Sequence, residues 1–486
     1  MISDSFLVMV QRSLPFQLTE VQQDVVKRIG AFLFQPRERG AYLLRGYAGT
    51  GKTFLMSAIV KVLRALGREV VMLAPTGRAA KVLALHAGCA AYTIHKEIYR
   101  QDKVGELDAH FALGLNKHKD AVFIVDEASM IANESSLSAT FGSGSLLDDL
   151  VRYVYSSPGC TMILIGDNAQ LPPVEEEESP ALSVGVLRGM GLDVTGYQLT
   201  TVMRQAEESG ILFNATALRK ALVEKSDNMQ LPRVQFSGFN DIQSLSGTDM
   251  VETLQSDYDR YGLDQTVVVT RSNKRAVEYN LGIRNIIFGR EEQLAVGDVI
   301  MVVRNNYYWL EQLAADLRKE EAAQLPTNFL ANGDIAIVRA ITGHYDFYDL
   351  HFADVTLQFP DYSDMEIDVR VLLDALTSES PSLTREQSDC LYNGVMEDYA
   401  DIRTKAERMR KLRLDPNYNA LQIKYAYAVT CHKAQGGQWR NVYIDQGWLP
   451  PDGVNRSYLR WLYTAFTRAT ENLYLVNWPE EQTVSN

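Results

Sequence analysis

A glycine-rich stretch between a strand-like run and a helix-like run constrains the fold of this chain more than any other segment. Residues 46–53 read Gly-Tyr-Ala-Gly-Thr-Gly-Lys-Thr, after the apolar run 41–44 and before a helical pattern over 54–66. The glycines let the backbone curl so that several N–H groups face one anion, and the helix adds the positive end of its dipole. The pattern predicts a phosphate-binding loop; the alternative is a glycine-rich connection that binds nothing.

Two side chains of this loop have expected tasks in binding a nucleoside triphosphate. Lys52 can reach the β- and γ-phosphates, and the Thr53 hydroxyl can ligate Mg²⁺. The residues expected to hold the nucleotide are Gly46, Ala48, Gly49, Thr50, Gly51, Lys52 and Thr53.

Strands and helices alternate after this loop. Strand-like runs lie at 69–74, 122–125 and 161–165, with helical patterns between them. This alternation predicts a parallel sheet with helices on both faces. Ligands of such sheets bind at the carboxyl ends of the strands. The candidate site residues that follow these three runs are Pro75, Thr76, Asp126, Glu127 and Gln170.

Asp126, Glu127 and Gln170 suggest that the bound nucleotide is hydrolysed, and Gln22 upstream is a further candidate for the nucleotide site. Asp126 can hold Mg²⁺ and Glu127 can polarise a water molecule, although paired acids after a strand can also cap a helix. Gln170 is a candidate sensor of the γ-phosphate. Gln22, on a helix capped by Thr19, is either a solvated glutamine or a reader of the adenine edge.

Composition limits the class of protein. The chain has 486 residues and is 46% hydrophobic, which suffices for two or more cores. Its net charge of −13 argues against wholesale coating of nucleic acid but leaves room for a local basic groove. Widely spaced cysteines predict neither a zinc site nor disulfides, and no apolar run suits a membrane span. We expect a cytoplasmic protein, nucleoid-associated if bacterial, without membrane contacts. The cysteines are Cys89, Cys160, Cys390 and Cys431.

Two long segments interrupt the alternation. Residues 86–120 interleave basic and aromatic residues, among them Phe111, which suits a stacking platform for a single strand; an ordinary surface excursion is the alternative. Short strand-like runs and the tight-turn pair Asn332-Gly333 over 290–415 predict a small inserted β-barrel. Residues 383–415 are helical and charged, either solvated or in contact with phosphates.

A second strand and helix unit begins near residue 265 and resumes with a strand-like run at 425–430. Asn273-Lys274-Arg275-Ala276 resembles a guanine-reading N-K-x-D element without its aspartate, so GTP specificity is not supported. Arg204 is either a surface cation or a finger that neutralises phosphate charge.

Taken in order, these motifs resemble superfamily 1 helicases of the RecD-like and Dda-like branch, over about residues 18–476. The matching stretches are L-T-E-V-Q-Q, G-Y-A-G-T-G-K-T, A-P-T-G-R-A-A-K, T-I-H, V-D-E-A-S-M, G-D-N-A-Q-L-P-P-V, L-T-T-V-M-R-Q, A-Y-A-V-T-C-H-K-A-Q-G-G and L-Y-T-A-F-T-R-A. The resemblance implies an α/β fold of two RecA-like P-loop NTPase domains with parallel sheets, a small inserted SH3-like β-barrel and a short wedge subdomain. The expected boundaries are 1–195 for the first domain with its wedge excursion at 86–120, 196–289 and 416–486 for the second domain, and 290–415 for the insertion.

The same resemblance assigns roles to individual residues. Gln22 would contact adenine, and Gly436 would lie near the γ-phosphate. The implied catalytic residues are Lys52, Glu127, Gln170, Arg204 and Arg468, the two arginines being fingers supplied across the cleft. The implied metal ligands are Thr53 and Asp126. The residues implied to touch DNA are Pro75, Thr76, His95, Phe111, Asn273, Thr430 and His432, with Phe111 splitting base pairs.

The expected activity is that of an ATP-dependent DNA helicase with ATP and Mg²⁺ as cofactors. It would move 5′→3′ along single-stranded DNA and separate duplexes, in DNA repair or recombination. Expected partners are single strands, junctions with duplex, and single-strand-binding or replication and repair proteins. The alternatives are an RNA-directed remodeller of the same superfamily and a non-motor P-loop switch, which would not need Arg468 or His432.

Overall fold

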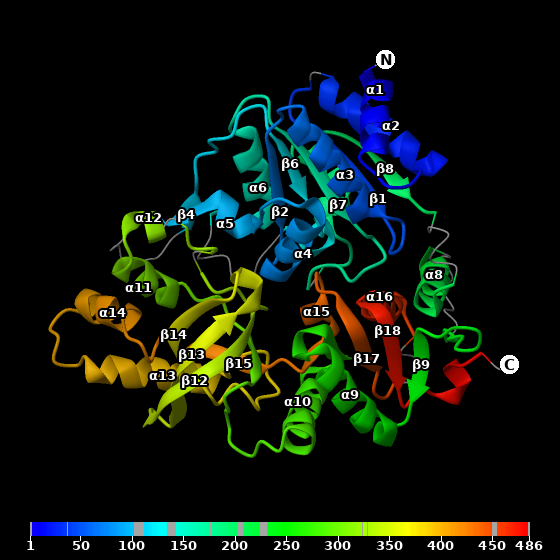
Figure 1. Cartoon of the computed structure of the whole chain (residues 1–486). Coiled ribbons are helices and arrows are strands. Elements are labelled where there is room, and N and C mark those ends of the chain that lie inside the picture. Colours follow the sequence, from blue (N-terminus) through cyan, green and yellow to red (C-terminus); the bar gives the residue numbers. More distant parts are fainter. Residues whose placement is uncertain are drawn as a thin grey trace.

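The computed structural model describes residues 2–35, 37–101, 111–133, 142–174, 176–201, 208–223, 231–322, 324–327, 329–449 and 454–484. Two parallel sheets and a closed β-barrel organise these residues, as expected. In Figure 1 the first sheet lies at the top, the second at the lower right and the barrel at the lower left.

The first sheet has the strand order β3-β2-β6-β7-β1-β8, and every neighbouring pair is parallel. Apolar clusters cover both faces, because the central strands are buried on both sides. The strands are β1 (Gly40–Gly46), β2 (Val70–Ala74), β3 (Ala91–Thr93), β6 (Val122–Val125), β7 (Thr161–Gly166) and β8 (Asp193–Leu199). The helices are α1 (Ile2–Arg12), α2 (Glu20–Phe34), α3 (Lys52–Ala65), α4 (Gly77–Ala87), α5 (Ile94–Ile98), α6 (Leu146–Tyr155) and α7 (Val184–Gly189).

The second sheet has the order β16-β10-β17-β18-β9 and is also parallel. Its strands are β9 (Ile242–Leu245), β10 (Thr266–Thr270), β16 (Ala428–Thr430), β17 (Trp439–Asp445) and β18 (Ala469–Val476). Its helices are α8 (Gly210–Val223), α9 (Gly247–Tyr261), α10 (Asn273–Gly282), α15 (Cys431–Ala434) and α16 (Arg456–Phe466).

The barrel closes through β11 (Val299–Val302), β12 (Ile335–Phe347), β13 (Leu350–Phe359), β14 (Met365–Leu372) and β15 (Leu421–Tyr425). Its fifth strand, β15, lies beyond the predicted insertion 290–415. The run at 425–430, predicted as one strand, is divided between two sheets: β15 ends at Tyr425 in the barrel, and β16 (Ala428–Thr430) belongs to the second sheet. The helices inserted in the barrel are α11 (Tyr308–Asp316), α12 (Lys319–Ala322), α13 (Arg385–Asp398) and α14 (Lys405–Arg413). An apolar cluster that includes Phe352, Leu391 and Leu412 packs α13 and α14 against the barrel.

Two segments depart from the expected boundaries. β8 extends past residue 195 and still belongs to the first sheet, because it pairs along its length with β1. Within residues 86–120, β3 also belongs to the first sheet. The excursion proper is the antiparallel hairpin of β4 (Tyr99–Gln101) and β5 (Phe111–Leu113).

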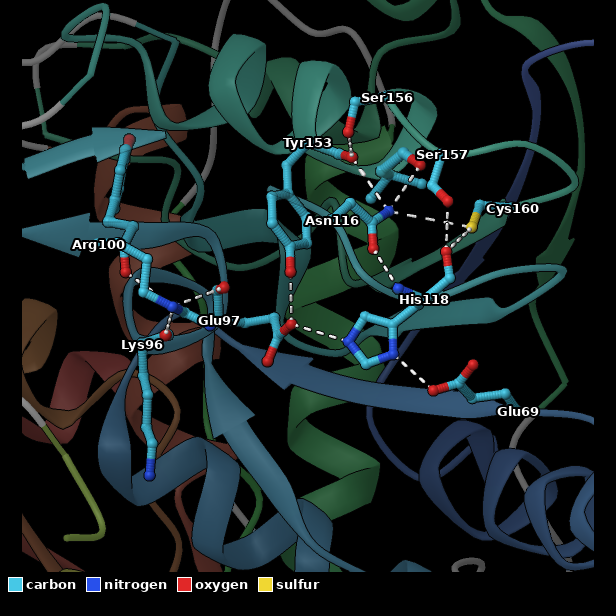
Figure 2. Close-up of polar contacts among 12 residues, drawn as sticks. Glu69, Lys96, Glu97, Arg100, Asn116, His118, Tyr153, Ser156, Ser157 and Cys160 are labelled. Atoms are coloured by element: carbon cyan, nitrogen blue, oxygen red, sulfur yellow. Dashed lines mark hydrogen bonds and ion pairs between the residues drawn. The ribbon is translucent and has the colours of Figure 1, made fainter. Parts of the chain in front are cut away.

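A histidine between two carboxylates lies at the base of this hairpin (Figure 2). His118 Nδ1 is 2.6 Å from Glu69 Oε1, and its Nε2 is 3.0 Å from Glu97 Oε1. The Tyr153 hydroxyl donates to the same Glu97 oxygen at 2.7 Å. Burial lowers the pKa of His118, but the hydrogen bonds to Glu69 and Glu97 outweigh it, so the net pKa is raised. The cluster ties α5 and α6 to the start of β2.

A buried ionic cluster lies where the chain passes from the second sheet into the barrel. Arg284 donates to the Asp298 carboxylate from Nε at 3.1 Å and from Nη2 at 3.0 Å. Arg290 Nη1 and the Tyr427 hydroxyl donate to Asp298 Oδ1 at 2.7 and 2.9 Å. Asp298 is fully buried and Arg284 is 2% exposed. Every carboxylate oxygen of Asp298 therefore has a charged partner.

Candidate nucleotide site between the two sheets

The phosphate loop has the predicted strand, loop and helix geometry. β1 ends at Gly46, α3 begins at Lys52, and Gly49 and Gly51 have left-handed φ angles of 73° and 80°. A Cβ at Gly46 would lie 2.9 Å from Leu199 Cβ, so only glycine fits there. Lys52 Nζ donates to the carbonyls of Gly46 at 2.6 Å and Tyr47 at 2.9 Å. The ammonium group therefore lies at the mouth of the loop.

Gln22, predicted to contact adenine, is hydrogen-bonded to the backbone of this loop. Gln22 is 3% exposed and forms a capping box with Thr19 at the start of α2. Its Nε2 donates to the Thr50 carbonyl at 3.5 Å. Thr50 is 1% exposed, and its hydroxyl donates to the Tyr47 carbonyl at 2.7 Å. The amide of Gln22 is therefore placed beside the phosphate loop, and its contact with adenine stays a prediction.

The two acidic residues follow β6 directly. Glu127 has a left-handed φ of 50°, and its N–H donates to Asp126 Oδ1 at 2.9 Å. Burial, followed by the charge of Glu127, raises the pKa of Asp126 to about 7, while Lys52 opposes the shift. A hydroxyl, a carboxylate and phosphate oxygens form the donor set that Mg²⁺ prefers, so Thr53 and Asp126 fit this ion.

Gln170 lies in the loop after β7 and is 7% exposed. Its Oε1 atom is buried and has no hydrogen-bond partner within the described part of the chain. A buried acceptor without a partner is costly unless a ligand or water satisfies it. This geometry fits a residue that accepts a hydrogen bond from an attacking water.

The second domain reaches the phosphate loop through α16. The Tyr463 hydroxyl donates to Asp167 Oδ2 at 2.6 Å and accepts from Ala48 N–H at 2.8 Å. The Thr464 hydroxyl accepts from Leu171 N–H at 2.9 Å. One turn of α16 thus contacts both the phosphate loop and the loop that carries Gln170.

Tyr463 was not expected in the site from its sequence pattern. The tyrosine lies within the stretch L-Y-T-A-F-T-R-A, where only Arg468 was singled out. Arg468 itself is 2% exposed. Its guanidinium donates to the carbonyls of Thr464 at 3.0 Å and Gly437 at 3.1 Å, and to the Thr467 hydroxyl at 3.3 Å. The structure therefore places Arg468 behind the interface, one residue from Gly436, and its role as a finger stays a prediction. Arg204 lies outside the described residues.

Gly436 lies directly against the first domain. A Cβ added to it would be 3.2 Å from both Thr76 Oγ1 and Ala79 Cβ, and its φ of 74° also favours glycine. Next to it, the Arg78 guanidinium stacks 3.9 Å from the ring centroid of Trp439. The start of α4 therefore meets the loop between α15 and β17.

Most of the residues expected to contact DNA form two groups, one in each domain. Thr76 caps α4, and Pro75 precedes it at the end of β2. In the second domain Thr270 pairs with Thr430, which brings Asn273 and the exposed His432 to the same edge of that sheet.

His95 belongs to neither group. It lies in α5, and its side chain packs against the inserted segment. Its ring lies 5.8 Å from Phe329 and 5.7 Å from Tyr99, and burial lowers its pKa to about 4. The backbone of Phe111 lies in β5, and its side chain lies outside the described part of the structure.

Comparison with known proteins agrees with this geometry. A model of the AAA domain matches residues 17–231, and a model of the UvrD-like helicase C-terminal domain matches residues 425–476. The ATP-dependent RecD2 DNA helicase of Deinococcus radiodurans is 32% identical over 177 residues, which cover 36% of this chain and 21% of that protein. The ATP-dependent DNA helicase dda of Enterobacteria phage T4 is 27% identical over 277 residues, 53% of this chain and 55% of that protein.

Together these matches support a superfamily 1 helicase of the RecD-like and Dda-like type. A crystal structure of Pif1 helicase from Bacteroides in complex with ADP-AlF3 and ssDNA has a TM-score of 0.47 and 16% identity, over 97% of this helicase and 95% of that chain. No helix among the described residues of the helicase has the length and apolar character needed to cross a membrane.

Proposed function

We propose that this helicase hydrolyses ATP at the interface between its two sheets and uses the cycle to move 5′→3′ along single-stranded DNA, separating duplex ahead of it. The contact of Tyr463 with both Ala48 and Asp167 carries this proposal. It joins the second domain to the phosphate loop and to the loop of Gln170, so a nucleotide in that loop lies where the domains meet.

The residues of the first domain supply the chemistry of hydrolysis. Lys52 binds the terminal phosphates, and Glu127 takes the proton of the attacking water as Gln170 orients it. Mg²⁺, held by Thr53 and Asp126, would neutralise charge on the phosphates. Arg204 and Arg468 would act from the second domain, Arg468 once its guanidinium leaves the carbonyls of Thr464 and Gly437, so closure of the interface would complete the site.

Loss of the γ-phosphate removes the group that the second domain grips, so the interface opens. Thr76 on one domain and Thr430 and His432 on the other would alternately hold the strand. Contacts mainly with phosphates make the movement independent of sequence and sensitive to salt. Phe111 on the hairpin would part the duplex.

The expected partners are therefore single strands and their junctions with duplex, together with single-strand-binding or replication and repair proteins. We place the protein in the cytoplasm, as its widely spaced cysteines suggest.

Strand displacement with 5′-tailed, 3′-tailed and blunt DNA duplexes tests the proposal. We expect ATP-dependent displacement of the 5′-tailed duplex only. Displacement of the 3′-tailed substrate alone would reverse the polarity. ATPase stimulation by single-stranded RNA but not DNA would indicate an RNA-directed enzyme, and no stimulation by either would indicate a non-motor switch.

A further inference from the structure

An arginine of the second domain lies on the phosphate loop. Arg219 extends from α8, and its guanidinium carbon lies 4.3 Å from the ring centroid of Tyr47, the second residue of the loop. α8 packs against α16, the helix that carries Tyr463. Figure 1 shows these two helices side by side, on the part of the second domain that faces the first sheet. Arg219 and Tyr463 therefore approach adjacent residues of the same loop.

The surroundings of Arg219 concentrate positive charge at this point. Lys52 Nζ donates to the carbonyl of Tyr47 at 2.9 Å, so two cations flank one residue. The charge of Arg219 also acts on the Tyr463 hydroxyl, which accepts from Ala48 N–H. The loop offers its own N–H groups to an anion in the same region. A polyanion bound there would experience both cations.

Within the described part of the chain, the guanidinium of Arg219 keeps donors available for such a ligand. Its one hydrogen bond to a described residue is from Nη1 to the Thr200 carbonyl at 3.2 Å, and the side chain is only half-buried. Stacking on a ring uses the face of the guanidinium and leaves its N–H edge free to form bidentate bonds with phosphate oxygens. Arg468, in contrast, is buried and donates to two carbonyls and a hydroxyl.

We propose that Arg219 is a further catalytic arginine, which the second domain supplies to the terminal phosphates of the nucleotide and which the ring of Tyr47 holds in position. This inference rests on the proposed function, since it assigns a residue to the same nucleotide site. A cation on the γ-phosphate stabilises the charge that develops during phosphoryl transfer, and it favours the triphosphate over the diphosphate in binding.

Substitution of Arg219, with a neighbour on the same helix as control, tests this role in the full-length chain. Arg219→Ala should lower the DNA-stimulated kcat by roughly 10³-fold, at the lower end of the range of arginine fingers. It should weaken binding of a non-hydrolysable ATP analogue by about tenfold or more and change ADP binding less than about threefold. Arg219→Lys should restore part of the analogue affinity, because the charge remains and the fork is lost. Lys220→Ala, at the exposed next residue, should behave as the unaltered chain.

The ratio of the two affinities separates a phosphate contact from a packing role. If Arg219 only packs on Tyr47, Arg219→Ala will weaken ADP and the ATP analogue equally, and this result would overturn the proposal. Unchanged kcat and affinities would overturn it as well. The unaltered chain tests the proposed function independently: if it has no DNA-stimulated ATPase activity, the helicase proposal fails, while the two affinities still decide the role of Arg219.

Discussion

The hydroxyl of Tyr463 provides a measurable link between the two domains. Tyr463→Phe removes one oxygen and keeps the ring, so the packing of this 1% exposed side chain changes little. The substitution removes the donor to Asp167 Oδ2 and leaves the N–H of Ala48 without its acceptor. A hydrogen bond to a charged group contributes about 1.5–3 kcal/mol, and a buried unpaired donor costs about 1–3 kcal/mol. We expect the substitution to cost about 3 kcal/mol.

Tyr42 offers a matched control within the first sheet. Its ring is 2% exposed, and its buried hydroxyl has no hydrogen-bond partner among the residues described. Tyr42→Phe should therefore be neutral or stabilise the protein by up to about 1 kcal/mol, because it removes an unpaired polar group.

Urea unfolding of both variants, followed by fluorescence, measures the difference. We expect Tyr463→Phe to lower the midpoint of the transition in which the domains separate, and Tyr42→Phe to leave it unchanged or raise it. If both variants unfold at the same midpoint, the bridging hydrogen bonds contribute nothing and the reasoning fails.

Three further predictions concern catalysis, strand separation and pH. Lys52→Ala should abolish ATP hydrolysis, measured as phosphate release, while the circular dichroism spectrum stays unchanged. Phe111→Ala should keep DNA-stimulated hydrolysis and impair strand displacement; equal loss of both would exclude a wedge role. The pKa of His118 is raised in the folded chain by Glu69 and Glu97, so its stabilising effect is full below its unfolded pKa and is lost as pH rises through the folded value. His118→Gln should therefore lower the free energy of unfolding more at pH 6 than at pH 8, and a constant difference would contradict the ion-pair interpretation.

The sequence predicted those parts of the site that local patterns encode. The strand at 122–125 and the acids after it are found as expected, because four buried apolar residues before two carboxylates can hardly be placed otherwise. The loop at 46–53 was predicted for a similar reason, since glycine adopts its left-handed angles with the least strain.

The contacts between the domains correspond to no local pattern in the sequence from which they could be predicted. Tyr463 and Ala48 are 415 residues apart, and Tyr463 reads as an ordinary core residue of an amphipathic helix. The same holds for Arg219, which reads as a helix-surface cation. The run at 425–430 also looked like one strand, whereas β15 ends at Tyr425 in the barrel and β16 starts at Ala428 in the second sheet. The buried Tyr427 between them bonds to Asp298, a partner that a local pattern cannot reveal.

The cluster around Asp298 determines which parts of the molecule can move separately. Breaking a buried ion pair costs about 3–5 kcal/mol, so Arg284 and Asp298 fasten the barrel to the second sheet. The inserted segment contacts the first domain through the partly exposed pair of Lys81 and Asp361, 3.3 Å apart, which contributes at most about 1 kcal/mol, and through the ring of His95 against Phe329. We therefore expect the barrel and the second sheet to move as one rigid unit, and the barrel to shift relative to α4 in each cycle of ATP hydrolysis.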